Sequence, residues 1–231
     1  GLDKTTAGTT TLSGTNTYTG TTTVSAGNLN LNSAGTAIAG NLTVAGGTAT
    51  LQAADQIADG KNVVVTSGTL DVASFNDTVN GVQITGGTIT GTTGALTSTT
   101  AFDLQAGTVS AILGGTAGAN KTTAGTVTLS KTNTYTGATT VSAGTLTLGH
   151  ATNTLADAST VVVSGGTLDL GGNADTVAGV QQTGGTIQNG TLTSTTAFDM
   201  QAGTASANLA GAVGLDKTTA GTTTLSGTNT Y

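Results

Sequence analysis

Apolar and polar residues alternate along short stretches of this chain, and each stretch follows a glycine. A typical stretch is Thr145-Leu146-Thr147-Leu148, in which both leucines fall on one side of an extended backbone. This period of two is typical of a β-strand with one buried face. The sequence therefore predicts an inward column of Leu29, Ala49, Leu70, Ile89, Val109, Val127, Leu146, Leu168, Ile187 and Ala205. The preceding residues predict an outward ladder of Thr48, Thr69, Thr88, Thr108, Thr126, Thr145, Thr167, Thr186 and Thr204.

Two further apolar columns repeat along the chain. The second contains Val24, Val44, Val65, Ile84, Leu104, Val141, Val163 and Met200, each of which lies three residues before a glycine that opens a strand of the first column. In the same strands Phe102 and Phe198 are expected to point inward, with Asp103 and Asp199 pointing out. A shorter third column contains Ile57, Val79, Ile112, Leu155, Val177 and Leu209. Three short strands joined by Gly, Asn and Ser corners predict a three-faced coil, and no helical period competes with them.

The glycines that open the first column recur at a nearly constant interval. They are Gly8, Gly27, Gly47, Gly68, Gly87, Gly107, Gly125, Gly144, Gly166, Gly185, Gly203 and Gly221. Repeats of about 20 residues are typical of solenoid proteins, in which each coil contacts only its neighbours. The sequence thus predicts an all-β, parallel solenoid with about 19–20 residues in each coil.

A larger repeat is superimposed on the coils. The segment GLDKTTAGTTTLSGTNTY at 1–18 returns unchanged at 214–231, which makes 1–213 one full repeat. We expect 1–117 to form a six-coil half-repeat, 118–213 a five-coil half-repeat and 214–231 the start of the next repeat, within one continuous solenoid. The chain is then expected to be an excerpt of a longer array, with neighbouring copies of itself as head-to-tail partners, either covalent or stacked.

Composition excludes several other classes of protein. The chain contains 58 Thr and 37 Gly but no Pro and no Cys, so every strand can pair on both sides and no disulfide or thiolate metal site is expected. A net charge of −6 without any Arg argues against a nucleic-acid partner. No apolar run approaches the roughly 18 residues that span a bilayer, so no membrane insertion of this segment is expected.

Two longer segments carry a family resemblance. Residues 4–31 and 121–149 follow the pattern K-x-x-x-G-x-x-x-L-S-x-T-N-T-Y-T-G-x-T-T-V-x-A-G-x-L-x-L, and 217–231 holds a truncated copy. The pattern resembles the autotransporter-associated β-strand repeat, although Lys131 stands where Gly is usual. The resemblance implies a right-handed parallel β-helix in the passenger of a bacterial secreted or surface protein, often an adhesin or a filamentous-haemagglutinin-like stalk. It implies no catalytic residues.

Candidate catalytic groups are few. Polysaccharide-cleaving β-helices need clustered carboxylates, but Asp71 and Asp77 recur as Asp169 and Asp175, and Asp103 recurs as Asp199. Repeated carboxylates of this kind are interpreted as solvated strand or turn residues. Asp55 and Asp59 are interpreted as a polar corner, and the lone His150 as a corner side chain without a second metal ligand. We therefore expect no enzyme activity, no cofactor and no metal.

The remaining repeated residues are interpreted as structural. These corner and ladder positions are Gly8, Gly27, Gly68, Gly125, Gly144, Gly166, Asn16, Tyr18, Asn133 and Tyr135. Each Asn is expected to bond local backbone and each Tyr to cover an adjacent coil, with sugar stacking by the Tyr as the alternative. The outward Thr ladder also suggests an ice-binding surface, but Asp71, Asp169 and Gln188 interrupt its second column.

The sequence therefore favours a structural repeat module of a long extracellular fibre or bacterial cell-surface stalk. The alternative is an adhesin passenger that binds glycan or a partner cell through a lateral face. Ice binding is a more remote alternative. Nothing in the repeat specifies a tip domain, an export route or an anchor.

Overall fold

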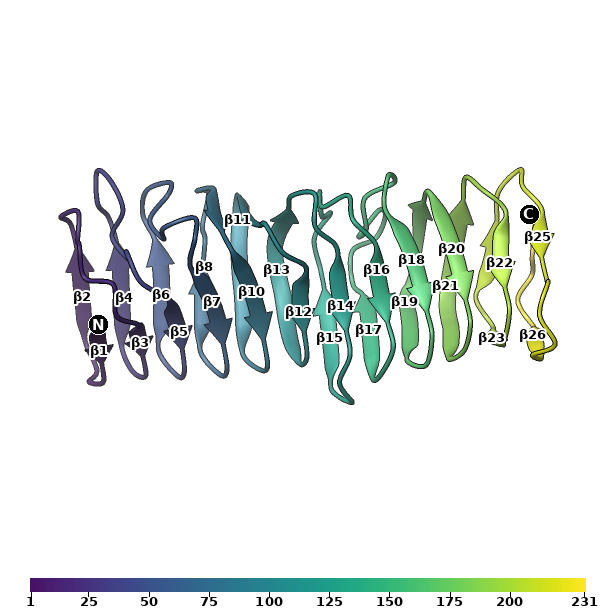
Figure 1. Cartoon of the computed structure of the whole chain (residues 1–231), viewed down its shortest axis with the longest axis horizontal. Helices are drawn as coiled ribbons and strands as arrows, with labels where there is room; N and C mark the ends of the chain where they lie inside the picture. Colours follow the sequence, from purple (N-terminus) through teal and green to yellow (C-terminus); the bar gives the residue numbers. More distant parts are fainter. The chain divides into compact units, whose positions relative to one another are not determined.

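The computed structural model describes all 231 residues, Gly1–Tyr231, and consists of β-strands joined by turns (Figure 1). The chain divides into two compact units, Gly1–Gly115 (unit 1) and Thr116–Tyr231 (unit 2). No helix is long and apolar enough to cross a membrane. The parallel β-solenoid with about 19 residues in each coil, which the sequence predicts, is confirmed.

Unit 1 contains two long parallel sheets, here called sheet A and sheet B. Sheet A consists, in spatial order, of Leu2–Lys4 (β1), Thr22–Val24 (β3), Leu42–Val44 (β5), Asn62–Val65 (β7), Gly81–Ile84 (β10) and Phe102–Leu104 (β12). Sheet B consists of Thr9–Leu12 (β2), Asn28–Leu31 (β4), Thr48–Leu51 (β6), Thr69–Asp71 (β8), Thr88–Ser98 (β11) and Gly107–Gly114 (β13). Spatial order follows chain order in both sheets, so every coil adds one strand to each.

Unit 2 repeats this arrangement with its own strands. Sheet A here contains Ala119–Lys121 (β14), Thr139–Val141 (β16), Thr160–Val163 (β18), Gly179–Gln182 (β20), Phe198–Met200 (β22) and Leu215–Asp216 (β25). Sheet B contains Thr126–Leu129 (β15), Thr145–Leu148 (β17), Thr167–Val177 (β19), Thr186–Ser194 (β21), Gly203–Ala205 (β23) and Thr223–Leu225 (β26).

A shorter third face completes the coils. In unit 1, Asp77–Val79 (β9) pairs with the second half of β11, and Ile38 forms an isolated bridge with Ile57. In unit 2, the second halves of β19 and β21 pair with each other, and Asn208–Ala210 (β24) pairs with β21. The long strands β11 and β19 change register between their halves, which is where each turns from sheet B onto the third face.

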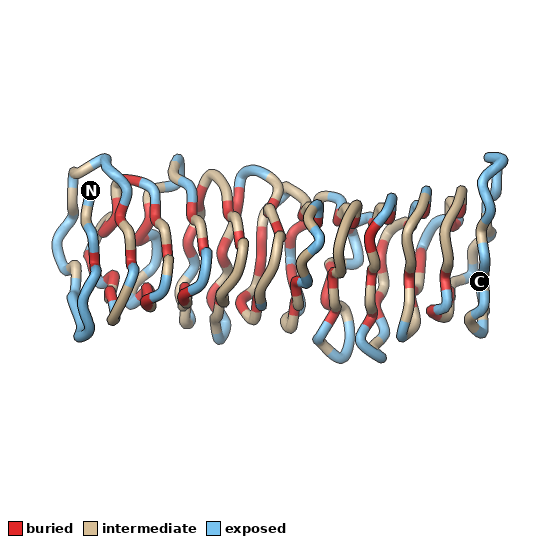
Figure 2. Tube along the Cα trace, turned by 90° about the horizontal axis from the view of Figure 1, so that it is seen from below, coloured by how far each residue is buried: buried red, intermediate tan, exposed pale blue.

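Alternation along the strands builds a core inside each unit. Both predicted columns beside the anchor glycines are buried, from Val24 and Leu29 in unit 1 to Met200 and Ala205 in unit 2. Figure 2 shows these buried positions alternating with half-buried ones along the strands. One member of the third column is wrong: Ile112 is only half-buried, because the alternation of β13 runs unbroken from Val109 and places Ala111 and Leu113 inward instead.

The predicted outward Thr ladder is in register within each unit. Thr48 pairs with Thr69, Thr69 with Thr88 and Thr88 with Thr108 in unit 1. Thr126, Thr145, Thr167, Thr186 and Thr204 pair in the same way in unit 2. These side chains are half-buried or exposed, so sheet B presents a row of hydroxyl-bearing residues on its outer side. Ice binding by this row stays a prediction.

Candidate functional site

A lysine spans two coils at the corner after β1 in unit 1, and its counterpart does so after β14 in unit 2. The Lys4 ammonium donates to the carbonyl of Thr6 in its own coil and to that of Ala26 in the next, at 3.3 Å. The Lys121 ammonium donates likewise to Thr123 and, at 3.3 Å, to Ala143. Both lysines are buried. Each ammonium therefore binds main-chain oxygens of two neighbouring coils, which is a structural role.

Gly27 and Gly144 leave the space that these ammonium groups occupy. Both have left-handed backbone conformations, with φ of 65° and 63°, which glycine adopts without strain. A Cβ atom on Gly27 would lie 2.7 Å from the Lys4 nitrogen, and one on Gly144 would lie 2.6 Å from the Lys121 nitrogen. Any larger residue would therefore strain the backbone and displace the lysine.

The other anchor glycines differ in what surrounds them. A Cβ atom on Gly68 would lie 2.2 Å from the Gly47 carbonyl oxygen, and one on Gly166 would lie 2.8 Å from the Val141 side chain. Gly8 faces open space and has a φ of 96°. The Gly125 carbonyl accepts a hydrogen bond from the Thr145 amide at 3.2 Å.

The Asn-Thr-Tyr corners tie coils together through side-chain amides. The Asn16 amide donates to its own corner at Gly14 (3.1 Å) and to Ala37 of the next coil (2.8 Å). Asn133 makes the equivalent bonds to Lys131 (3.1 Å) and Thr154 (2.8 Å).

The tyrosines of these corners bond within their own coil. The Tyr18 hydroxyl lies 2.8 Å from that of Thr22, and the Tyr135 hydroxyl lies 2.8 Å from that of Thr139. Tyr135 is fully buried, whereas Tyr18 is half-buried. Full burial of Tyr135 leaves no ring face for sugar stacking, so the observed role of this side chain is packing.

Two carboxylates that the sequence suggests to be solvated are instead buried. Asp77 is 1% exposed, and its Oδ2 atom accepts the amides of Gln56 (2.8 Å) and Ile57 (3.0 Å) from the preceding coil. Desolvation raises the pKa of Asp77 to about 7, with nearby Asp55 and Asp59 contributing in the same direction. The interpretation of Asp77 as a solvated turn residue is therefore wrong: its side chain replaces missing backbone pairing on the third face.

Asp175 occupies the equivalent position in unit 2, and its interpretation as a solvated turn residue is also wrong. It is 2% exposed, and its Oδ2 atom accepts the Leu155 amide at 3.1 Å. Burial raises the pKa of Asp175 to about 6, and Asp157 contributes in the same direction. The Oδ1 atoms of both Asp77 and Asp175 are buried without a hydrogen-bond partner.

The remaining polar candidates are turn and corner residues. Asp71 and Asp169 accept backbone amides two residues on, at 2.8 Å each, as turn residues do. Asp55 and Asp59 are exposed. The His150 ring nitrogen Nδ1 lies 2.6 Å from the Thr152 carbonyl, within its own corner. No group of three or more His, Cys, Asp or Glu residues is arranged to hold a metal ion.

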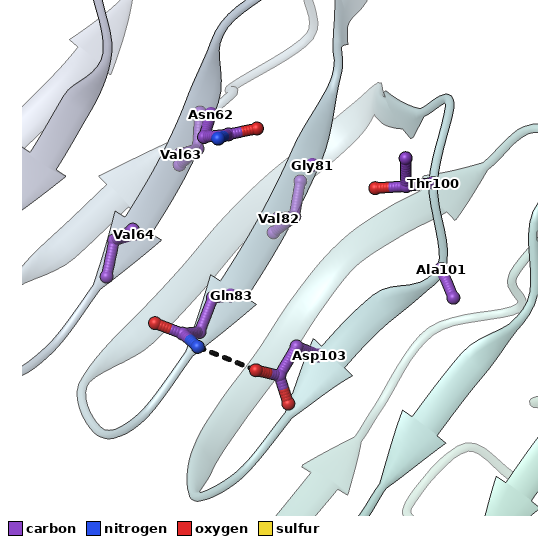
Figure 3. Close-up of a pocket in the computed structure, with 9 residues that line it drawn as sticks. All are labelled: Asn62, Val63, Val64, Gly81, Val82, Gln83, Thr100, Ala101 and Asp103. Carbon is purple, nitrogen blue, oxygen red and sulfur yellow. Dashed lines mark hydrogen bonds between the residues drawn. The ribbon is translucent and has the colours of Figure 1, made fainter.

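A shallow groove lies on the outer side of sheet A in unit 1, across β7, β10 and β12. Its volume is about 230 Å³, and it is lined by Asn62, Val63, Val64, Gly81, Val82, Gln83, Thr100, Ala101 and Asp103. Strand pairing places Gln83 between Val64 and Asp103. The Gln83 amide donates to Asp103 Oδ2 at 2.6 Å (Figure 3), and the Gln105 amide donates to the same oxygen at 2.8 Å. The amides thus hold the carboxylate in one orientation.

Gly81 forms the hollow of this groove. A Cβ atom there would lie 3.1 Å from the Asn62 side-chain oxygen and 3.1 Å from the Thr100 hydroxyl. Figure 3 shows Gly81 between these two side chains. The backbone of Gly81 is not in the left-handed region, so the residue matters here for the space it leaves.

Unit 2 carries an equivalent groove across β18, β20 and β22. Its volume is about 310 Å³, and it is lined by Thr160, Val161, Val162, Gly179, Val180, Gln181, Thr196, Ala197 and Asp199. The Gln181 amide donates to Asp199 Oδ2 at 2.7 Å, and Gln201 also bonds this carboxylate. A Cβ atom on Gly179 would lie 2.9 Å from the Thr196 hydroxyl. The glycine, the Gln–Asp pair and the threonine are therefore the same in both grooves.

Each groove combines a fixed carboxylate, an amide, a hydroxyl and an apolar strip, and its lining contains one acid and no base. Glycoside hydrolysis ordinarily requires two carboxylates about 5 to 9.5 Å apart. The arrangement therefore supports hydrogen-bonded binding. Sequence reasoning placed Asp103 and Asp199 outward but missed the grooves. The available signal was a glycine at an outward strand position, which often marks close approach by another group.

The passenger-associated-transport-repeat family model matches the chain at residues 2–31, 120–148 and 142–170, together about a third of its length. These matches confirm the resemblance to the autotransporter passenger repeat. They include the Lys4 and Lys121 corners, whereas the groove residues of unit 1 lie outside them. No curated protein and no solved structure matches the chain.

Proposed function

We propose that this chain is a non-catalytic structural module of a secreted or cell-surface passenger protein, in which stacked coils extend other groups away from the cell. The family match and the solenoid fold fit a passenger repeat. The observation that carries the proposal is parallel pairing that adds one strand per coil to each sheet, in both units. Such pairing propagates along a rod, with each coil stabilised by its neighbours.

Successive full repeats, each equivalent to 1–213, join head-to-tail in this proposal, so that the coils form one continuous solenoid. Support comes from residues 214–231, which repeat 1–18 and place Leu215 and Asp216 in β25, as Leu2 and Asp3 lie in β1. The test is small-angle X-ray scattering or electron microscopy of chains with one and two repeats. With coils about 4.8 Å apart, eleven additional coils lengthen the rod by about 53 Å. An unchanged length, or two rods that tumble independently, contradicts the proposal.

The absence of catalysis is supported by how the carboxylates are used. Asp77 and Asp175 are buried on backbone amides, and Asp103 and Asp199 are held by glutamine amides. A screen of the purified chain against polysaccharide substrates should release no reducing ends above the rate of a heat-denatured sample. Release that depends on Asp103 or Asp199 contradicts a purely structural module.

An adhesin passenger that binds through a lateral face is the second candidate. The observation that favours it is the pair of equivalent grooves on the outer side of sheet A. A scaffold alone does not require a hollow at the same strand position in both units.

A further inference from the structure

The two grooves share nearly all of their lining. Eight of the nine positions hold the same residue, and the exception is Asn62 in unit 1, which corresponds to Thr160 in unit 2. Beside them the units differ at core position Ile84, which corresponds to Gln182. Apart from Asn62, the outward residues of the groove are therefore retained where an adjacent inward residue has changed. Packing of the core does not explain this retention, because Gln83, Gln181 and the two aspartates point outward.

The lining restricts the chemistry of a ligand. Neither groove contains Lys, Arg or His, so neither offers a partner for a phosphate, sulfate or carboxylate. Each contains a single carboxylate, which is too few oxygen ligands for a calcium ion that takes six to eight. What remains is a set of groups that bind hydroxyls: a carboxylate oxygen, a glutamine amide and a threonine hydroxyl. Val64 and Val162 add a half-buried apolar strip in each groove.

The size of the grooves restricts the possible ligands further. Volumes of about 230 and 310 Å³ lie at or below the lower end of ordinary small-molecule pockets, which is roughly 300 Å³. Both grooves are also open to solvent on the outer side of the sheet, so a polymer can extend beyond them. One six-membered ring with hydroxyl groups on its edge and an apolar face fits this space and these contacts.

We propose that each groove binds one ring of a neutral glycan, with Asp103 in unit 1 and Asp199 in unit 2 accepting hydrogen bonds from sugar hydroxyls. Gln83 and Gln181 hold these carboxylates in place and donate to sugar oxygens. The ring lies over Gly81 or Gly179, where the absence of a side chain leaves room. This inference goes beyond the structural role proposed above, since a rod can stack without binding any sugar.

The rims of the two grooves differ, and this difference predicts unequal affinity. In unit 1 the Asn80 amide donates to the Asn62 side-chain oxygen at 2.8 Å, which fixes a polar rim. In unit 2 these positions are Ala178 and Thr160, and the groove is larger. We expect the unit 1 groove to bind more tightly because its rim offers an additional fixed hydrogen-bonding group.

The test is a titration of the ¹⁵N-labelled chain with neutral trisaccharides built from glucose, galactose or mannose, followed by NMR. At least one of them should shift the side-chain amide signals of Gln83 and Gln181, with millimolar affinity and two sites per chain. The variant Gly81→Val, Gly179→Val fills both hollows and should weaken binding at least tenfold. The matched control Thr23→Val, Thr43→Val adds the same side chain elsewhere on the outer side of sheet A and should leave binding unchanged.

A second variant keeps the groove open. Asp103→Asn, Asp199→Asn preserves shape but removes the strong acceptors, and we expect affinity to fall about fivefold while the circular dichroism spectrum stays the same. A sulfated trisaccharide should bind more weakly than its neutral parent.

Three outcomes overturn the proposal. They are no shift with any of the trisaccharides, binding that survives the filled grooves, and binding that is lost with EDTA, which would indicate a metal-dependent site. None of them alters the rod length measured for one and two repeats, so the structural role is tested separately.

Discussion

Sheet A of unit 1 and sheet A of unit 2 carry nearly the same groove, but beside it their cores differ in polarity at one position. Ile84 in β10 is fully buried among apolar residues, whereas its counterpart in β20 is Gln182, which is buried to the same extent. The Gln182 amide donates to the carbonyls of Gly185 and Thr204 at 3.0 Å each, but its oxygen has no partner. The fold therefore tolerates a polar core residue where backbone carbonyl oxygens can accept its hydrogen bonds.

This difference indicates what determines the register of the coils. The backbone ladder around Gln182 is unchanged: β20 pairs with β18 through four residues and with β22 through two, as β10 does with β7 and β12. Apolar columns supply stabilisation, but parallel hydrogen bonding keeps the strands aligned even where the column is interrupted. The experiments below perturb one unit and use the equivalent position of the other as a control.

The largest effect is expected for the pH dependence of the buried aspartates. Folded unit 1 keeps the Asp77 proton up to a pH of about 7, whereas the unfolded chain releases it near the ordinary pKa of 3.8. Unfolding thus releases a proton between these values, and stability falls as the pH rises through this window. The difference corresponds to about 4 kcal/mol at most. Urea unfolding of Asp77→Asn from pH 4 to 8 should show a flatter profile and higher stability than wild type at pH 8.

Asp175→Asn is the matched variant in unit 2. Desolvation raises the pKa of Asp175 only to about 6, so its window is narrower. Three backbone amides lower this pKa, compared with two at Asp77, and one neighbouring aspartate raises it, compared with two. A profile for Asp175→Asn that stays as steep as that of wild type between pH 4 and 6 would contradict the assigned burial.

The second-largest effect on stability is expected from substitution of Ile84 in the core. Ile84→Gln places an amide into an apolar environment, and we expect the free energy of unfolding to fall by about 3 kcal/mol from lost burial and an unsatisfied polar group. Equilibrium urea denaturation measures this change. A loss below about 1 kcal/mol would mean that unit 1 offers the same carbonyl acceptors as unit 2.

The two asparagine corners should differ in how much each asparagine contributes to stability, because they differ in burial. Asn133 is 1% exposed and Asn16 is half-buried, although both make the same pair of hydrogen bonds. Substitution by Ala should cost about 2 kcal/mol at Asn133 and about 1 kcal/mol at Asn16, since water replaces the lost hydrogen bonds less readily at the buried corner. Thermal unfolding of the two variants compares them directly, and equal costs would show that exposure is irrelevant at this corner.

The smallest effect is expected for Gln182→Leu. The substitution removes the partnerless amide oxygen but also the two donated hydrogen bonds, so we expect a net gain of about 1 kcal/mol. The same urea titration as for Ile84→Gln detects it. Destabilisation instead would show that the two carbonyl contacts outweigh the unsatisfied atom.

Most of the fold follows from the sequence because the alternation within a strand and the regular recurrence of the anchor glycines are both legible in the order of the residues. Val24, Leu29 and their counterparts could be placed inward from alternation alone. Ile112 could not, because its direction depends on whether the alternation of β13 is interrupted after Val109, and it continues unbroken through Ala111 and Leu113. Alternation did hold information on Asp77, which lies two residues before buried Val79, but its charge favoured the opposite interpretation.

The grooves could be only partly predicted, since the outward glycine is visible in the sequence but its neighbours across the strands are not. Each one combines residues from three strands of successive coils, and its depth depends on whether the middle strand has a side chain at Gly81 or Gly179. The corner residues were predicted only in part. Lys4 and Asn16 could be recognised as repeated residues, but the next-coil carbonyls to which they donate hydrogen bonds are known only from the structure.

The parallel register of the coils has a consequence at the level of the gene. Residues 1–18 and 214–231 are identical, and where they are encoded by the same codons an unequal exchange between them adds or removes one full repeat in frame. Because the strands of sheets A and B in each unit pair with the equivalent strands of the next coil, we expect the new junction to join the same faces as the old one. Inheritance can therefore change the number of lateral grooves on a chain in steps of two, without any change in the residues that line them.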